Sequence, residues 1–217
     1  MTTSVSSMEM VQVDPARDDH DLALTVVSEF PAIDVDAAEG AVRALLRALG
    51  ADQRSPHLDE TPRRVANAFA EFLRPKPFDL TTFANDENYH DLVLVRDIPF
   101  RSLCQHHLLP FHGVAHVGYV PAQRILGLSK LARVVDHVAA DLQTQERLTT
   151  QVADWLEDNL APSGVGVVLE ADHMCMSLRG VRAIGARTRT STVRGRLRHN
   201  AHSRQEFLSL TNSPSGA

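Results

Sequence analysis

The sequence contains no long apolar segment. No run of about 18 apolar residues occurs in the 217 residues, and the first thirty residues hold no basic stretch followed by an apolar one. Neither a membrane span nor a secretory signal is therefore predicted, and we expect the protein to be cytoplasmic.

Cysteine is also scarce. The only two cysteines are Cys104 and Cys175, which are too few for a disulfide-based scaffold. A pair of cysteines in a cytoplasmic chain is typical of burial in the core, of metal binding or of catalysis. The count by itself favours burial, so the other two roles depend on what surrounds each thiol.

Lysine is nearly absent, and the charges are unevenly spread. Lys76 and Lys130 are the only lysines, beside twenty arginines, and the net charge is −5. Residues 1–60 hold twelve acidic residues against four arginines, whereas 179–198 hold seven arginines and no acid. This predicts a local anion-binding role near the C-terminal end. The net negative charge and the lack of a recognisable module argue against nucleic acid as a partner.

The composition predicts one folded domain with short tails. Hydrophobic residues make up 43% of the chain and charged residues 23%, close to the average of globular proteins. Residues 1–20 are polar and acidic without a sustained apolar period, and we interpret them as a mobile tail. We expect the domain to span residues 21–210, with a C-terminal tail at 211–217.

Two amphipathic helices are predicted after the tail. The first begins at Asp36, whose side chain would cap it in a box with Glu39, and ends at Gly50. The second begins with Thr61 as its N-cap and ends before Pro75. The apolar residues of the first helix recur at helical spacing and are Val42, Leu45, Leu46 and Leu49.

The rest of the chain alternates strand pairs with helices. Runs rich in β-branched residues predict strands, and apolar residues three and four apart predict helices. The predicted strands are 92–98, 114–120, 165–171 and a stretch within 181–193, and the predicted helices begin at Ser129 and cover 148–160 and 203–210. Paired strands with helices between them indicate the α+β class with antiparallel sheet.

A thiol and an imidazole lie three residues apart in the His-rich segment between the first two strands. They belong to Cys104 and His107, and Cys175 supplies the second thiol. Thiolate and imidazole ligands suit Zn²⁺, and three protein ligands with one open position are typical of a catalytic site. A structural zinc would need a fourth ligand, and two buried unliganded cysteines remain the alternative.

Histidines cluster around both thiols. His106, His107, His112 and His116 fall within thirteen residues of Cys104, and His173 precedes Cys175 by two residues. In an extended strand these last two side chains share one face, so the imidazole is a candidate proton shuttle beside a metal. We interpret His112 and His116 as solvated or strand-surface residues.

Four motifs occur in a fixed order, and together they resemble one family. They are CQHHLLPFHG at 104–113, GLSKLAR at 127–133, QTQERLT at 143–149 and HMCM at 173–176, followed by Arg179-Gly180. This series closely resembles GTP cyclohydrolase I, and the resemblance extends from about residue 36 to Glu206-Phe207. It implies a tunnelling fold, in which antiparallel strand pairs of several subunits close into a barrel. The usual assembly is a homodecamer.

The resemblance also implies a reaction and its metal. The family converts GTP and water to formate and 7,8-dihydroneopterin triphosphate, in folate or pteridine synthesis. Its zinc ligands correspond here to Cys104, His107 and Cys175. Its catalytic histidines correspond to His106 and His173.

The family's substrate-binding positions are present as well. Glu146, with Gln145 beside it, occupies the position that accepts the guanine N1–H and 2-amino group. Without the resemblance, these residues would be interpreted as a solvated helix face. The positions that correspond to contacts with the triphosphate and the ribose are Lys130, Arg133, Arg179, Arg64 and Ser129.

Two residues depart from the family pattern. Gln105 replaces the usual glutamate and cannot act as a base, and Asp141 stands where a basic residue is common. A change of charge near the metal would move the rate or the pH optimum. The alternatives are therefore a paralogue that feeds 7-deazapurine or specialised pterin synthesis, or a non-catalytic, zinc-stabilised oligomer that binds nucleotide.

Overall fold

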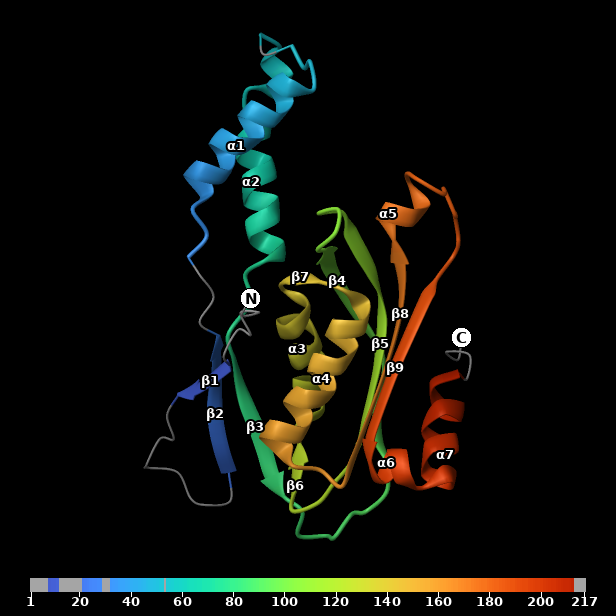
Figure 1. The fold of residues 1–217 in the computed structure, drawn as a ribbon. Helices are drawn as coiled ribbons and strands as arrows, with labels where there is room; N and C mark the ends of the chain where they lie inside the picture. The colour runs from blue at the N-terminus through green and yellow to red at the C-terminus, as the bar shows by residue number, and fades with distance from the viewer. Residues whose placement is uncertain (1–7, 12–20, 29–31, 53, 213–217) are drawn as a thin grey trace, which may run out of the picture.

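The computed structural model describes residues 8–11, 21–28, 32–52 and 54–212 (Figure 1). Its main sheet has five strands in the order β7-β4-β5-β8-β9, antiparallel except for the parallel pair β4 and β7. The strands are β4 Val93–Cys104, β5 Pro110–Val120, β7 Leu142–Gln143, β8 Gly164–His173 and β9 Thr188–Gly195. Helices and a curled sheet confirm the predicted α+β class.

A second, four-stranded sheet was not predicted. It is antiparallel and has the order β1-β2-β3-β6, with the strands β1 Met8–Val11, β2 Asp21–Ser28, β3 Phe78–Ala84 and β6 Arg124–Leu126. Strand β1 lies within the segment 1–20 that we interpreted as a tail. The other residues of that segment, and 213–217, lie outside the described residues, so the domain boundaries stay predictions.

The first two helices form as predicted, but their caps differ. Helix α1 is Val35–Ala48, and Asp34 rather than Asp36 caps it by accepting a 2.9 Å hydrogen bond from Ala37 N. The carboxylate of Asp36 lies inside the first turn and pairs with Arg63 of the second helix instead.

The second helix begins one residue earlier than its predicted cap implies. Helix α2 is Thr61–Phe72, preceded by the short 3₁₀ helix η1 at Pro56–Leu58. Its N-cap is Glu60, because the hydroxyl of Thr61 donates to the carbonyl oxygen of His57 at 3.4 Å and is not used for capping. The predicted N-cap at Thr61 is therefore wrong.

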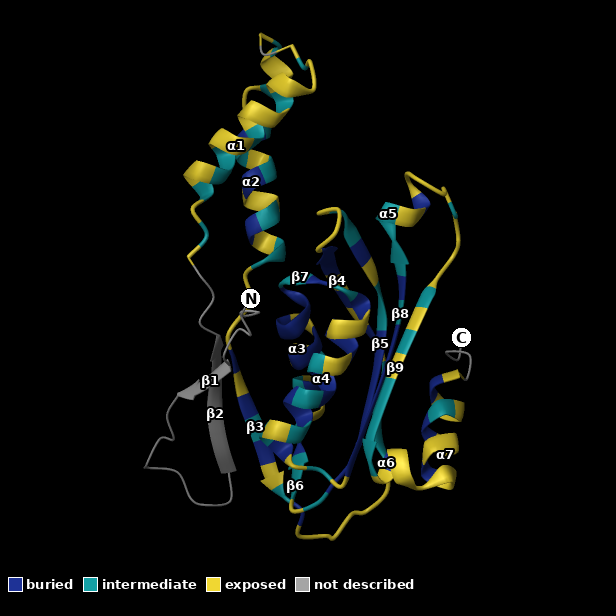
Figure 2. Cartoon of the chain, in the orientation of Figure 1, coloured by how far each residue is buried: buried dark blue, intermediate teal, exposed yellow. Residues whose placement is uncertain are grey.

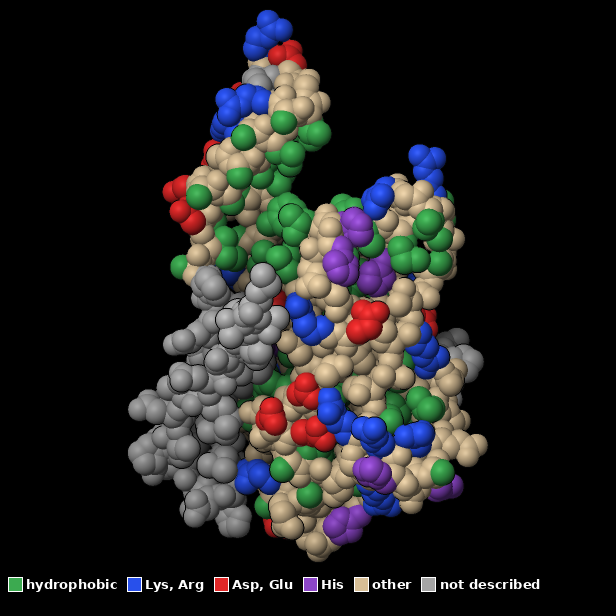
Figure 3. Space-filling model, in the orientation of Figure 1, with side chains coloured by type: hydrophobic (Ala, Val, Ile, Leu, Met, Phe, Trp, Pro, Cys, Tyr) green, Lys and Arg blue, Asp and Glu red, His purple; other side chains and the backbone are tan. Residues whose placement is uncertain are grey.

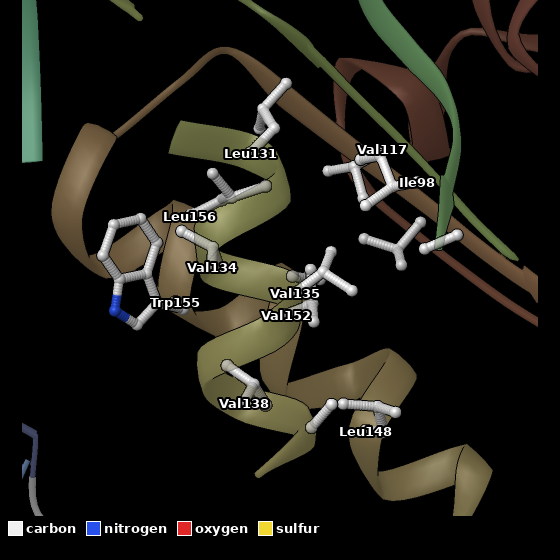
Figure 4. Packing of buried hydrophobic residues seen from close by; sticks show 14 of the residues in the cluster. Ile98, Val117, Leu131, Val134, Val135, Val138, Leu148, Val152, Trp155 and Leu156 are labelled. Carbon is white, nitrogen blue, oxygen red and sulfur yellow. The ribbon is translucent and has the colours of Figure 1, made fainter. Parts of the chain in front are cut away.

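Two helices cover one face of the main sheet and form the core with it. Helix α3 is Leu128–Ala139 and helix α4 is Gln145–Leu160. Their apolar residues recur at helical spacing, so each helix turns one stripe towards Ile98 and Val117 of the sheet (Figure 4). The stripes consist of Leu131, Val134, Val135 and Val138 on α3 and Leu148, Val152, Trp155 and Leu156 on α4.

The opposite face of the sheet is covered by the C-terminal helices. Helices α6 Arg196–His199 and α7 Ala201–Asn212 follow β9 (Figure 1). Phe207 of α7 is fully buried and packs against Gly166 of β8. The close approach requires Gly166, where a Cβ atom would lie 2.6 Å from the Phe207 ring. Glycine therefore allows α7 to sit directly on the sheet.

The pair of helices α1 and α2 projects away from the main sheet (Figure 1). No residue of α1 is buried, and its Leu45 and Leu49 are 56% and 72% exposed (Figure 2). Amphipathic helices normally bury their apolar stripe, but this stripe is not covered by any other described part of the same chain. None of the helices in the described ranges combines the length and the apolar character needed to cross a membrane.

Candidate active site

A tight turn between β4 and β5 carries the first cysteine and two histidines. Cys104 is the last residue of β4, and its N–H donates to Leu109 O at 2.9 Å. Leu108 N donates to Cys104 O at 2.8 Å, and Leu108 has a positive φ of 54°. The turn therefore reverses the chain within a few residues and places His106 and His107 next to the thiol.

Pairing of β5 with β8 brings the second cysteine to this turn. Phe111 and His173 are register partners, and helix α5 Met174–Ser177 follows β8 directly, so Cys175 lies beside the turn. The ligand atoms of Cys104, His107 and Cys175 all lie within 4.8 Å of one another. Figure 3 shows histidine side chains gathered at this end of the molecule.

The donor set fits a zinc ion. Cys104 Sγ lies 3.7 Å from His107 Nδ1, which is close to the separation of ~3.5 Å expected for sulfur and nitrogen ligands at about 2.3 and 2.0 Å from one tetrahedral ion. Burial raises the pKa of Cys175 most, and the neighbouring Cys104 raises it further. Two thiolates that are shielded from water repel each other, so the protonated form is favoured. A divalent cation removes that repulsion, so the pair of thiols favours metal binding.

His173 is held by contacts on two sides. Its ring stacks on Phe111 with a centroid distance of 4.6 Å and an interplanar angle of 3°. Its Nε2 lies 2.7 Å from Oε1 of Gln145. Burial lowers the pKa of His173, while the nearby carboxylates of Glu146 and Asp172 act in the opposite direction. The imidazole is thus rigidly placed at the edge of the metal site.

The first turn of α4 presents two adjacent residues in different environments. Thr144 caps the helix by accepting a 3.2 Å hydrogen bond from Arg147 N. Gln145 is 1% exposed, and its amide makes contacts within the protein. Glu146 is exposed and close enough to His173 to raise its pKa. Only Glu146 of the two has a side chain open to solvent.

The structure brings His106 and Arg179 close to the same site. His106 is exposed, and its Nδ1 lies 3.9 Å from Cys104 Sγ. Arg179 follows α5 and is exposed, and its charge acts to lower the pKa of Cys175 against the larger effects that raise it. Arg179 and His106 therefore border the group of Cys104, His107 and Cys175, which we call the metal-ligand group.

Other predicted substrate residues lie far from this site within one chain. Ser129 and Lys130 are in the first turn of α3, immediately after β6. The Tyr119 hydroxyl accepts a 2.8 Å hydrogen bond from Leu126 N, which ties this end of α3 to the far end of β5. Because a strand rises about 3.3 Å per residue, Tyr119 is roughly 30 Å from Pro110, where β5 meets the metal-ligand turn.

Arg133 and Arg64 are also not joined to the metal-ligand group. Arg133 is exposed one turn further along α3, and Arg64 is exposed in the first turn of α2 on the projecting pair of helices. The structure thus places Ser129 and Lys130 at the far end of β5 and Arg64 on the projecting helices. Arg133 lies beside Ile98 to Arg101 of β4, partway between that far end and Cys104.

One residue near the site had no role in the sequence analysis. Arg147 donates to Oε1 of Gln105 at 3.0 Å and to Oε1 of Gln143 at 2.8 Å, and it also bonds to Leu142 O. Its guanidinium lies 3.8 Å from the carboxylate of Asp141. Arg147 therefore joins both departures from the family pattern in one network. Only its place in the QTQERLT motif could have drawn attention to it.

The two histidines that we interpreted as surface residues differ. His112 is exposed, as predicted. His116 is buried at 8% exposure, and its Nδ1 accepts a 3.2 Å hydrogen bond from Asp97 N. The prediction is wrong for His116, because a bulge in β4 turns the Asp97 N–H towards the imidazole.

Comparison with known proteins decides the family. Residues 38–212 match the model of the family described as GTP cyclohydrolase I. The chain belongs to the GTP cyclohydrolase I family. The resemblance inferred from the four motifs and the prediction of an enzyme are both confirmed. The Cys104, His107 and Cys175 group fits the zinc binding expected of a GTP cyclohydrolase I.

Relatives named GTP cyclohydrolase 1 share about half of their residues with the chain. The relative from Aquifex aeolicus is 49% identical, over 82% of this chain and 97% of its own length. Those from Thermobifida fusca and Streptomyces avermitilis are 52% and 55% identical, over 82% and 85% of this chain and 88% and 92% of their own lengths. The similarity therefore extends over most of this chain and most of each relative.

Proposed function

We propose that this protein converts GTP and water to formate and 7,8-dihydroneopterin triphosphate, using Zn²⁺ bound by Cys104, His107 and Cys175. The observation that carries the proposal is the gathering of these three ligands beside His173 and Glu146, in a chain of this family. Three protein ligands leave one position for water, as in catalytic zinc sites. When bound, zinc supplies a water of lowered pKa for hydrolysis.

The residues around the metal would handle protons and recognise the base. Opening of the guanine imidazole ring needs a proton delivered to a ring nitrogen and later removed, and we assign these transfers to His106 and His173. Glu146 is exposed at the start of α4. Its carboxylate would accept hydrogen bonds from the guanine N1–H and 2-amino group, which adenine lacks.

We assign the triphosphate and the ribose to residues of two subunits. Arg179 lies beside the metal-ligand group, whereas Ser129 and Lys130 begin helix α3 at the opposite end of the sheet and Arg133 lies one turn further along that helix. A neighbouring subunit packed in the opposite sense would bring these three residues, and Arg64 from its projecting helices, to the site. The complete site would then form only in a homo-oligomer.

Open edges and exposed apolar residues support this oligomer. Strand β9 is one edge of the main sheet, and β7 pairs with only the last two residues of β4. Joining β4 of one subunit to β9 of the next would close a barrel and remove both edges. Leu178, Val181 and Ile184, next to the metal site, are 70%, 77% and 85% exposed. We expect a decamer, which sedimentation analysis would distinguish from a monomer or a pentamer.

The neutral Gln105 favours one alternative, a paralogue that serves 7-deazapurine or specialised pterin synthesis. A binding-only oligomer is a further alternative, although an open metal position has no use in such a protein. The cytoplasmic location stays a prediction.

Incubation of the zinc-loaded protein with GTP tests these proposals. Formate release and the fluorescence of the oxidised pterin are followed in the same sample. Formate and pterin together would support the full reaction. Formate alone would mean that the ring opens but does not reclose, and neither product, with GTP bound, would contradict the proposed function.

A further inference from the structure

We propose that Gln145 is a positioning residue that holds His173 in one orientation and one tautomer, and that it does not contact the substrate. The inference rests on the proposed function for the meaning of His173, but the orientation itself follows from hydrogen bonds within the protein. Gln145 is 1% exposed, whereas its neighbour Glu146 is open to solvent.

The amide group of Gln145 is fully used inside the protein. Its Nε2 donates to Leu169 O at 3.2 Å, Thr188 O at 3.0 Å and Thr190 Oγ1 at 3.1 Å. A primary amide has two hydrogens, so three acceptors leave none of them for a ligand. The acceptors belong to β8 and β9, so two strands fix the amide nitrogen in place.

These acceptors also decide which way the amide points. If Gln145 were flipped, its carbonyl oxygen would face the two carbonyl oxygens of Leu169 and Thr188. Buried oxygens without a donor between them are strongly unfavourable. The oxygen Oε1 is therefore the atom that faces His173, at 2.7 Å from its Nε2.

An acceptor at this place selects one tautomer of the neutral imidazole. Since Oε1 of Gln145 can only accept, His173 Nε2 carries the hydrogen and donates it. Nδ1 is then the ring nitrogen that Gln145 leaves without a contact of its own. Stacking on Phe111 at 4.6 Å fixes the plane of the ring, and the Gln145 bond fixes its rotation within that plane.

The chain offers a matched pair of variants, because Gln145 and Glu146 are adjacent in one helical turn. Gln145→Met keeps the length and the burial of the side chain but removes the hydrogen bond to His173. We expect kcat of the zinc-loaded enzyme to fall roughly 10- to 100-fold, as for the loss of residues that orient an active-site ligand. The dissociation constant for GTP should stay within about twofold of wild type, while Glu146→Gln should weaken GTP binding.

Nitrogen-15 NMR of histidine-labelled protein measures the tautomer without GTP or turnover. His173→Gln identifies the signal, which should show a protonated Nε2 in the unmodified protein and lose that preference in Gln145→Met. A protonated Nδ1 in the unmodified protein, or a loss of GTP affinity in Gln145→Met equal to that in Glu146→Gln, would overturn the proposal.

The two readouts separate this inference from the proposed function. A protonated Nε2 in a protein that releases no formate would support the positioning role and contradict the activity. If Gln145→Met does not fold, the tautomer of the unmodified protein still decides the question.

Discussion

Arg147 on α4 donates a hydrogen bond of 3.0 Å to the amide oxygen of Gln105, in the turn between the candidate metal ligands Cys104 and His107. The start of α4, which carries Glu146, is thereby connected to the metal-ligand turn. A carboxylate at position 105 would accept the same hydrogen bond with a charge added.

This contact predicts that the neutral Gln105 is tolerated. Arg147 already has a carboxylate 3.8 Å away in Asp141, and the pair is 41% and 44% exposed, so a second carboxylate adds little. We expect Gln105→Glu to change kcat/KM by less than about fivefold, the equivalent of ~1 kcal/mol for an exposed ion pair.

Arg147→Met should have the larger effect, because it removes the donor to Gln105 and Gln143 together. We expect lower zinc retention during dialysis and lower turnover. Steady-state kinetics and metal analysis of both variants check this. A larger loss in Gln105→Glu than in Arg147→Met would contradict the role given to the hydrogen bond.

Removal of one thiol should remove the metal. Cys175→Ala leaves Cys104 and His107 as two ligands, which is one fewer than catalytic zinc sites have. We expect zinc content and formate release to fall together to background levels. Met176→Leu, one residue further along α5, is the control and should retain the metal. Full activity of the metal-free protein would disprove zinc dependence.

Loss of Glu146 should abolish discrimination for the guanine 2-amino group. We expect wild type to prefer GTP over inosine triphosphate roughly 10- to 100-fold, as hydrogen bonds to a charged group contribute about 1.5–3 kcal/mol. Glu146→Ala should bind both nucleotides weakly and equally. Binding is measured by calorimetry with each nucleotide.

Arg196→Ala is the control for the Glu146 variant. Arg196 directly follows β9, at the end of that strand away from the metal-ligand turn. Its side chain donates to His90 O at 2.9 Å. We expect its loss to leave turnover almost unchanged. Equal losses of turnover in the two variants would contradict the site assignment.

Stability should depend strongly on Gly113, a residue of β5 that faces β8. A Cβ atom at Gly113 would lie 1.9 Å from the backbone oxygen of Glu170, and this oxygen belongs to the strand ladder. We expect Gly113→Ala to cost about 3 kcal/mol or more of unfolding free energy.

The exposed Gly40 in α1 is the matched control for the stability measurement. Nothing lies within 4 Å of a Cβ atom built there. Gly40→Ala should stabilise the protein by about 0.5–1 kcal/mol, because alanine loses less entropy in a helix. Denaturant unfolding measures both variants, and an equal loss in the two would show that the close approach is unimportant.

Stability should fall in mild acid because of His116. Burial lowers the pKa of His116 most, and the cations Arg189 and Arg96 lower it further. The carboxylates of Asp97 and Glu170 act in the opposite direction and raise it. The folded protein therefore binds this proton less readily than the unfolded chain. The contribution of His116 is present above its unfolded pKa of about 6.5 and is lost as the pH falls from there towards the folded value.

The denaturant midpoint, measured between pH 7.5 and 5.0, tests this linkage. His116→Gln should reduce the loss of stability over that interval. His112→Gln, on the same strand but exposed, should leave it unchanged. If neither variant changed the pH dependence, another group would be responsible for it.

Some elements could be read directly from the sequence because their patterns are local. The apolar residues of α3 and α4 recur three and four apart, and helices form through hydrogen bonds between neighbouring turns. The spacing of Cys104 and His107 indicated a shared metal for the same reason, since one turn joins them. The second thiol, Cys175, stood out because it is the only other cysteine and His173 lies beside it. The family motifs added Glu146, which spacing alone could not assign.

Other elements depend on strand pairing, for which the sequence has no local signal. Strand β3 and the buried environment of His116 were missed, and Asp34 took the capping role expected of Asp36. For the cap, a competing partner decided the outcome, because the carboxylate of Asp36 pairs with Arg63 instead.

By itself the sequence determined the longer helices, the α+β class and the three candidate metal ligands Cys104, His107 and Cys175. Only the tertiary structure decided how Gln145 is used and which predicted site residues meet in one subunit. The amide of Gln145 is oriented by Leu169, Thr188 and Thr190, which are 24 to 45 residues away along the chain. The physical reason is that a hydrogen bond depends on positions in space, and the register of β8 and β9 sets those positions.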